Sequence, residues 1–255
     1  MKVFSYCIVG VVLCGAGVAS AAGQAERAAA EELFALGNQA RATAGVRALQ
    51  WDPALAAAAM KHCERMVKEG PIAHRYGGEM GLAERAAAAG AHFSEIEENV
   101  AVGQYAGQIQ DGWMHSPGHR ENLLNPAVDH VGIAVIAARG VLYAVEDFSH
   151  AIASESPAQA EAAIAGLIRM SGVKVRRDPH DARLACATSS GLPRGLTGGE
   201  PGFIMRWQGP DLKRLPQALI DRLGSGQYRE ADVGSCSAHE DASGFTAYRM
   251  AVLLY

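Results

Sequence analysis

The sequence predicts an α+β protein with two domains. Helical segments come before a β-hairpin in the first part of the chain, which is typical of α+β layering. Charge also divides the chain, because residues 22–155 carry 10 basic and 17 acidic side chains, whereas residues 156–255 carry 12 and 10. Small and polar residues precede Pro157 at this division. We therefore expect a first domain at residues 25–152 and a smaller α+β domain at residues 157–255.

The start of the chain, residues 1–21, has the three parts of a signal peptide. Lys2 is basic, residues 7–18 are apolar, and Ala19-Ser20-Ala21 is a small-x-small cleavage pattern. An apolar run of about 12 residues is too short for a transmembrane helix of roughly 20. We expect a secreted or periplasmic protein without a transmembrane segment, and a mature chain that starts near Ala22.

The composition excludes two broad classes. Of the 255 residues, 49% are hydrophobic, which a packed protein has and a disordered chain does not. The net charge is -4, and no long run of Lys or Arg occurs, so we expect no nucleic-acid partner.

Helical periodicity, strand alternation and turn residues predict the individual elements. A helix at residues 52–69 starts with Asp52 as N-cap and buries one stripe of small and apolar side chains. A turn at Arg139-Gly140 joins two strands, and Glu146 and Asp147 on the second strand are expected to face solvent. In the first domain we expect helices at residues 25–44, 52–69, 80–89 and 109–115 and strands at residues 131–135 and 141–148.

The second domain contains no chemical motif. We expect Arg176 and Arg177 to lie on a solvated edge. Val131-Gly132 and Val233-Gly234 occur before the last β-rich segment of each part, an echo too weak to predict a repeat. The expected elements are helices at residues 158–170 and 212–223 and strands at residues 203–207 and 246–255.

Removal of a signal peptide would leave three cysteines, so at least one thiol stays unpaired. Cys63 lies in a helical stretch and is expected to be buried, whereas Cys186 and Cys236 could form a disulfide in an oxidising compartment. No Cys-x-x-Cys pair supports a thiolate metal site.

The segment Trp113 to Pro126 is the most informative part of the sequence. Ser116 and Pro117 are expected as N-cap and first residue of a short helix, which puts His119 in its first turn. The positive end of a helix disfavours imidazolium, so His119 is expected to be neutral. Pro117 interrupts the helix between His115 and His119 and argues against a metal-binding pair of these two.

Together with residues 38–55, Ile72-Ala73-His74 and Glu97-Glu98-Asn99-Val100-Ala101, this segment resembles the CAP superfamily of cysteine-rich secretory, antigen 5 and pathogenesis-related proteins, and most of all its bacterial secreted branch. The resemblance covers roughly residues 30–150. It implies a three-layer α-β-α sandwich with a cleft formed by two histidines and two acidic residues, which in some members holds a divalent metal.

Carried over by motif, the cleft residues are His74, Glu98 beside Asn99, and His119. At the position of the family's second acidic residue this chain has Ser116. Glu97 could be the cleft acid instead, although the Glu-Asn adjacency favours Glu98. His74 and His119 could bind Zn²⁺ and leave a coordination position open, or they could hydrogen-bond to Glu98 and only tie loops to the sandwich.

The function implied by the resemblance is a binding module for a lipid, peptide or cell-wall ligand. The alternative is a metal-assisted or serine hydrolase, because Ser116, His119 and Glu98 offer a hydroxyl, a base and an acid. No Gly-x-Ser-x-Gly elbow accompanies Ser116, whose place as N-cap is already a structural one. We therefore expect no catalytic residues.

Overall fold

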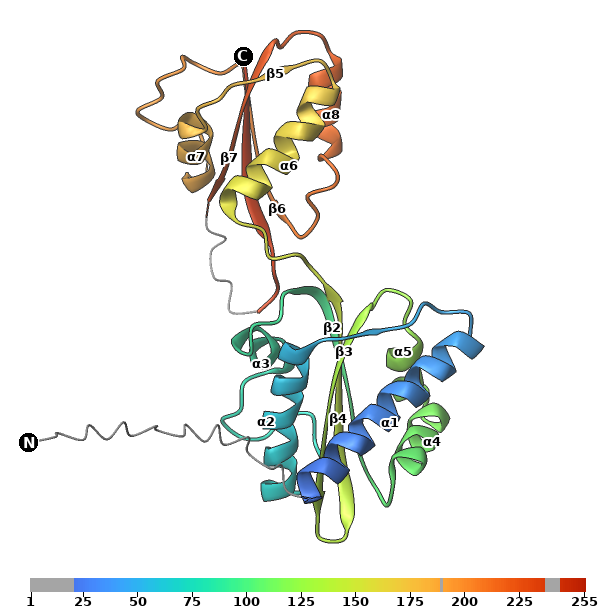
Figure 1. The fold of residues 1–255 in the computed structure, drawn as a ribbon. Helices are drawn as coiled ribbons and strands as arrows, with labels where there is room; N and C mark the ends of the chain where they lie inside the picture. The colour runs from blue at the N-terminus through green and yellow to red at the C-terminus, as the bar shows by residue number, and fades with distance from the viewer. Residues whose placement is uncertain (1–20, 189, 237–243) are drawn as a thin grey trace, which may run out of the picture.

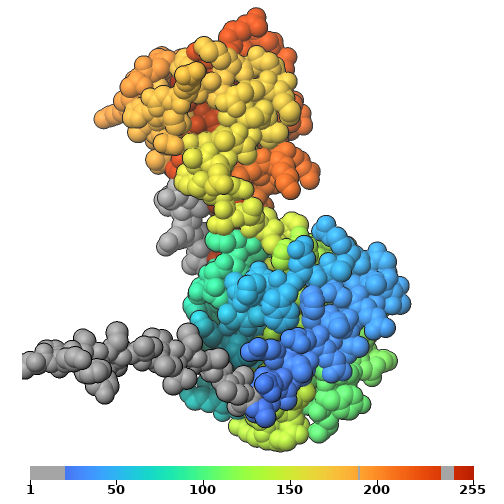
Figure 2. All heavy atoms as spheres, viewed as in Figure 1, coloured from blue at the N-terminus to red at the C-terminus, as the bar shows by residue number. Residues whose placement is uncertain are grey.

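The computed structural model describes residues 21–188, 190–236 and 244–255. The expected signal peptide lies outside these ranges except for Ala21, which begins the first helix. The described chain forms two four-stranded sheets with helices packed on them (Figure 1). Figure 2 shows two separate masses of atoms, which we call the first lobe and the second lobe.

The elements follow in chain order. In the first lobe they are α1 (Ala21–Thr43), β1 (Gln50–Trp51), α2 (Pro53–Glu69), α3 (Leu82–Ala88), β2 (Phe93–Gly103), α4 (Ala106–His115), α5 (Pro117–Leu124), β3 (His130–Ala138) and β4 (Val141–Ala151). In the second lobe they are α6 (Pro157–Met170), β5 (Lys174–Val175), α7 (His180–Ala187), β6 (Phe203–Gly209), α8 (Gln217–Gly224), β7 (Glu230–Cys236) and β8 (Tyr248–Leu254). None of the helices in the described ranges is long and apolar enough to cross a membrane.

The first sheet has the strand order β1-β3-β4-β2. Strand β1 pairs in parallel with β3, and the other pairs are antiparallel. Helices α1, α4 and α5 contact one another on one face, while α2 and α3 lie on the other face (Figure 1). The expected three-layer α-β-α sandwich is therefore confirmed.

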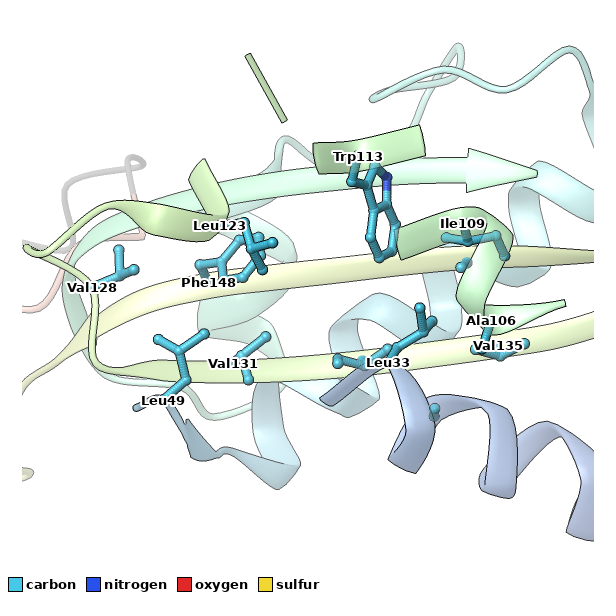
Figure 3. Packing of buried hydrophobic residues seen from close by; sticks show 13 residues of the cluster. Leu33, Leu49, Ala106, Ile109, Trp113, Leu123, Val128, Val131, Val135 and Phe148 are labelled. Carbon is cyan, nitrogen blue, oxygen red and sulfur yellow. The ribbon is translucent and has the colours of Figure 1, made fainter. Parts of the chain in front are cut away.

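The core under α1 and α4 is built around Trp113. Its indole lies over the sheet, with Leu33 of α1 and Phe148 of β4 among the surrounding side chains (Figure 3). On the other face α2 buries the predicted stripe, and Asp52 caps the helix by accepting from Ala54 N at 2.7 Å. These contacts hold α1 on one face of the sheet and α2 on the other, on either side of the β3 edge.

The second sheet has the order β5-β7-β8-β6, again with one parallel pair. Apolar residues of α6 and α8 share one cluster on one face, and those of α7 share another cluster with β8. The disulfide Cys186–Cys236 joins α7 to the end of β7, and Cys63 is a buried free thiol, so both expectations for the cysteines are confirmed.

Several expected elements were displaced or missed. Strand β2 was not predicted, because the polar run from Ser94 to Asn99 hides its alternation. The helix expected at 212–223 begins only at Gln217, since Pro216 stands before it. Arg177 is exposed as expected, whereas Arg176 is partly buried, because its guanidinium binds Glu230 at 3.0 Å and stacks on the ring of Tyr255.

Candidate functional site

The site lies where β2 passes under the loop between α2 and α3. Strand β2 holds Glu98, which is only 6% exposed, and the loop places His74 over it. His74 Nδ1 lies 2.8 Å from Glu98 Oε1, and the His74 side chain is 61% exposed. The structure therefore brings two of the expected cleft residues together, with the imidazole facing solvent and the carboxylate beneath it.

Arg85 of α3 completes this contact and was missed in the sequence. Its Nη2 donates to Glu98 Oε2, so Glu98 is bonded on both oxygens. The Arg85 side chain is 4% exposed, and its Nη1 donates to the carbonyl oxygen of His74 at 3.3 Å. A charged residue inside an alanine-rich helix was the available signal, because such a side chain is rarely buried without a partner.

A second buried pair fixes the loop from below. His62 of α2 is fully buried, with Nδ1 2.7 Å from Glu79 Oε1 and Nε2 2.9 Å from the carbonyl oxygen of Ala73. Glu79 also accepts from the backbone N–H of Tyr76 at 2.9 Å. Since Ala73 directly precedes His74, these bonds hold the cleft imidazole in place.

His119 reaches the site through its helix. Its carbonyl oxygen accepts from Asn99 Nδ2 at 3.0 Å, and Asn122 Nδ2 donates to the carbonyl oxygen of Glu98 at 3.2 Å. Asn99 is fully buried and also accepts from Asn122 at 3.1 Å. Asn99 thus links β2 to α5 and keeps the backbone of His119 next to the strand that carries Glu98.

The two histidines have opposite electrostatic biases. The hydrogen bond that His74 donates to the Glu98 carboxylate raises the pKa of His74, which favours its cationic form. Partial burial, and then the charge of His74, lower the pKa of His119. The site therefore combines one imidazole that favours its cationic form, that of His74, with one that favours its neutral form, that of His119.

The expectation that Glu146 and Asp147 face solvent was wrong. They are 1% and 0% exposed, because β4 is a central strand with helices on both faces. Burial raises the pKa of Glu146 to about 8. Burial, followed by the nearby charge of Glu98, raises the pKa of Asp147 well above its usual range. Asp147 is the cross-strand neighbour of Glu98, so a second acidic side chain does lie beside the cleft acid.

Ser116 occupies the N-cap position of α5, but its side chain makes no capping hydrogen bond. No described hydrogen bond joins it to His119, and the neighbouring His115 instead lies 2.8 Å from the carbonyl oxygen of Asp111. Glu97 is turned to Asn125, whose Nδ2 donates to it at 2.8 Å. Ser116, His115 and Glu97 therefore do not join the bonded group around Glu98.

The donor set does not fit a metal centre. Within residues 21–236 and 244–255, apart from residue 189, no group of three or more His, Cys, Asp or Glu side chains could hold a metal ion. Glu98 is already bonded to the guanidinium of Arg85, a permanent positive charge that repels a cation. The expected zinc site at His74 and His119 stays a prediction.

Comparison with known proteins gives a family match over part of the chain. Residues 34–148 match the family model "CAP: Cysteine-rich secretory protein family". Over 109 residues the chain is 31% identical to the uncharacterized membrane protein YlbC of Bacillus subtilis, covering 41% of this chain and 31% of that protein. It is 28% identical over 110 residues to the uncharacterized protein YkwD of the same bacterium, covering 42% of each. The match thus spans less than half the length of either curated relative.

Solved structures are similar over the same half of the chain. An extracellular protein of Bacillus anthracis containing a SCP domain is 25% identical with a TM-score of 0.46, covering 52% of this chain and 45% of that one. An outer surface protein of Borrelia burgdorferi is 20% identical with a TM-score of 0.45, covering 48% of this chain and 91% of that one.

Proposed function

Because residues 34–148 belong to the CAP family of cysteine-rich secretory proteins, we propose that this lobe is a binding module for a ligand of the cell envelope or the extracellular space. The cleft at His74 and His119 recognises an anionic group of that ligand, such as the carboxylate of a peptide or the phosphate of a lipid or cell-wall molecule. The signal-peptide pattern at residues 1–21 favours this location.

The observation that carries the proposal is the exposed imidazole of His74, whose cationic form Glu98 stabilises from beneath. The start of α5 adds to it, because the Ser116 side chain leaves the first N–H groups of the helix uncapped next to His119. A cationic imidazole and free N–H donors both favour an anionic partner. Hydrolysis receives no such support, since no described hydroxyl is hydrogen-bonded to His119.

Titration of the two imidazoles by NMR with inorganic phosphate and with acetyl-alanyl-alanine tests this function. We expect at least one of these anions to raise the pKa of His74 further and to bind at least tenfold more weakly to His74→Ala. Binding should weaken as pH rises through the pKa of His74, which the hydrogen bond to Glu98 holds above its ordinary value, because the cationic form is then lost. His115→Ala is the matched control, since His115 is exposed and outside the bonded group.

Two results would contradict the proposal. The first is a zinc-dependent rise in melting temperature that both His74→Ala and His119→Ala abolish, which would establish the metal site instead. The second is turnover of a chromogenic ester that His119→Ala and Ser116→Ala both abolish without loss of folding, which would establish the hydrolase.

A further inference from the structure

The open edge of β3 in the first lobe lies at the floor of a groove between α1 and α2. Strand β1 covers only the beginning of this edge, where it pairs with His130 and Val131. The groove has a volume of about 740 Å³. Its walls present Phe34, Trp51 and Met60, and its floor is Ile133 to Val135.

Backbone groups at this floor have no strand partner. The carbonyl oxygen of Val131 points outward, since it accepts from Asp52 N at 2.8 Å, and the N–H of Ala137 points outward to Glu26 Oε1 at 2.9 Å. Because hydrogen-bonding direction alternates along a strand, Ile133 and Val135 between them also point their N–H and C=O outward.

The surroundings make these unpaired groups costly. Ile133 and Val135 are 3% and 1% exposed, and no described residue pairs with their outward groups. Buried backbone donors and acceptors without a partner destabilise a fold, so nearly all of them are paired in native proteins. An edge at which both Ile133 and Val135 keep unpaired backbone N–H and C=O groups is suited to bind an added strand.

The second lobe shows what a closed edge looks like. The equivalent strand, β7, turns Ser235 N outward, and Glu161 of α6 accepts from it at 2.9 Å. Glu161 also binds Arg183 of α7 through two contacts of 2.7 Å, so an ion pair bridges the helices over the edge. In the first lobe the residue of α2 that packs on Gly132 of β3 is Ala56, whose side chain carries no charge, and the edge stays open.

We propose that the β3 edge of the first lobe binds an extended peptide segment of four or five residues as an added strand. The length follows from the distance between β1 and the Glu26 cap, which leaves residues 132–136 uncovered. Apolar side chains of the peptide that point to one face of the sheet contact Phe34 of α1, and those that point to the other face contact Met60 of α2. A basic side chain fits the rim, where Glu26 and Glu31 outnumber Arg27; the same charges disfavour a fatty acid.

Hydrogen exchange of the purified protein tests the open edge directly. In the free protein the N–H groups of Ile133 and Val135 should exchange much faster than those of Ala134 and Ile136, which pair with β4. A probe peptide should slow the exchange of Ile133 and Val135 at least tenfold. The probe is a fluorescein-labelled heptapeptide of alternating valine and threonine with one terminal lysine. Equal protection of all four groups in the free protein would overturn the proposal.

Matched variants separate strand addition from other binding. Ala56→Arg places a side chain in the groove as the second lobe does, and it should weaken peptide binding at least tenfold, whereas Ala57→Arg on the exposed side of α2 should not. N-methylation of the peptide amides that face β3 should weaken binding by the same factor. No binding of the peptide at millimolar concentration, equal binding of the methylated form, or tighter binding of palmitate would each overturn the proposal.

Discussion

In both lobes a helix precedes a two-residue strand that pairs in parallel with the third strand, and a final hairpin completes the sheet. The strand orders, β1-β3-β4-β2 and β5-β7-β8-β6, are the same order shifted along the chain. The second helix packs on a glycine of the third strand in each case, although Gly234 lies two residues further along its strand than Gly132 does. The two lobes therefore share one architecture, although no tandem repeat is visible in the sequence.

Strand register identifies what differs. Val131 pairs with Phe148 as Ala231 pairs with Leu254, so positions in the two sheets correspond one by one. With this correspondence of strand positions, Leu253 of the second sheet stands where Asp147 stands in the first, and its partner Ile204 stands where Glu98 stands. The cleft acids thus have apolar counterparts in the second sheet. Buried charge at these two positions belongs to the first lobe alone and agrees with the proposed site.

The glycine contacts give the largest expected effect. A Cβ at Gly132 would lie 2.0 Å from Ala56 N, and one at Gly234 would lie 2.3 Å from Arg183 N. We expect Gly132→Val and Gly234→Val each to destabilise the lobe that contains them by about 3 kcal/mol or more, because the backbone of a helix must move away. Denaturant unfolding followed by the fluorescence of Trp113 and Trp207 would measure this.

Gly112→Ala and Gly166→Ala are the controls for these variants. Both glycines are in helices, and a Cβ at either meets nothing within 4 Å. They should leave stability unchanged or raise it by up to about 1 kcal/mol. Normal stability of Gly132→Val would contradict the close packing of α2 on β3.

An effect of similar size is expected from the ion pair between Arg85 and Glu98. Arg85→Met leaves Glu98 buried without its cation and should destabilise the first lobe by about 3 to 5 kcal/mol. Arg85→Met combined with Glu98→Ile and Asp147→Leu gives the first lobe the apolar pattern of the second. This triple variant should recover most of the loss, since apolar replacement of a buried ion pair is often neutral or stabilising. Chemical denaturation measures both.

Arg120→Met controls for the loss of an arginine, because Arg120 is exposed on α5. It should change the free energy of unfolding by less than about 0.5 kcal/mol. A triple variant no more stable than Arg85→Met alone would show that the cleft residues are needed for folding, and that the apolar pattern of the second lobe cannot replace them.

The sequence predicts amphipathic elements well and paired polar elements poorly. Helix α2 follows from its N-cap and apolar stripe, and the hairpin of β3 and β4 follows from its turn. Strand β2 does not, because its polar side chains are buried only once α3 and the preceding loop cover them. Similarly, α7 and β7 are defined by contacts with each other more than by local propensity.

The site shows the same limit. The motif resemblance indicates His74, Glu98, Asn99 and His119, because they lie in recognisable segments. Arg85, Glu79 and His62 lie outside those segments and acquire their roles only through contacts between α2, α3 and β2. Local patterns cannot predict such pairs, since the partners are separated in the chain and each residue alone has the character of a solvated surface side chain.

The smallest expected effect is a dependence of the free energy of unfolding on pH, and it should differ between the two lobes. The pKa of Glu146 is about 8 in the folded state against an ordinary 4.5, so between these values only the folded state holds the proton. Stability of the first lobe should therefore fall as pH rises through this window, by at most about 1.4 kcal/mol per pH unit. In the second sheet the position of Glu146 is occupied by Val252, which does not titrate. The acid of the second lobe with a raised pKa is Asp232, at about 6, so the pH-dependent loss of stability in that lobe should end near pH 6. Unfolding at pH 6 and pH 8 should show a slope in the first lobe that Glu146→Gln reduces and the exposed Glu64→Gln leaves intact. Part of the slope should remain, because the pKa of Asp147 is raised as well. A slope that Glu146→Gln leaves unchanged would assign the proton to Asp147 alone.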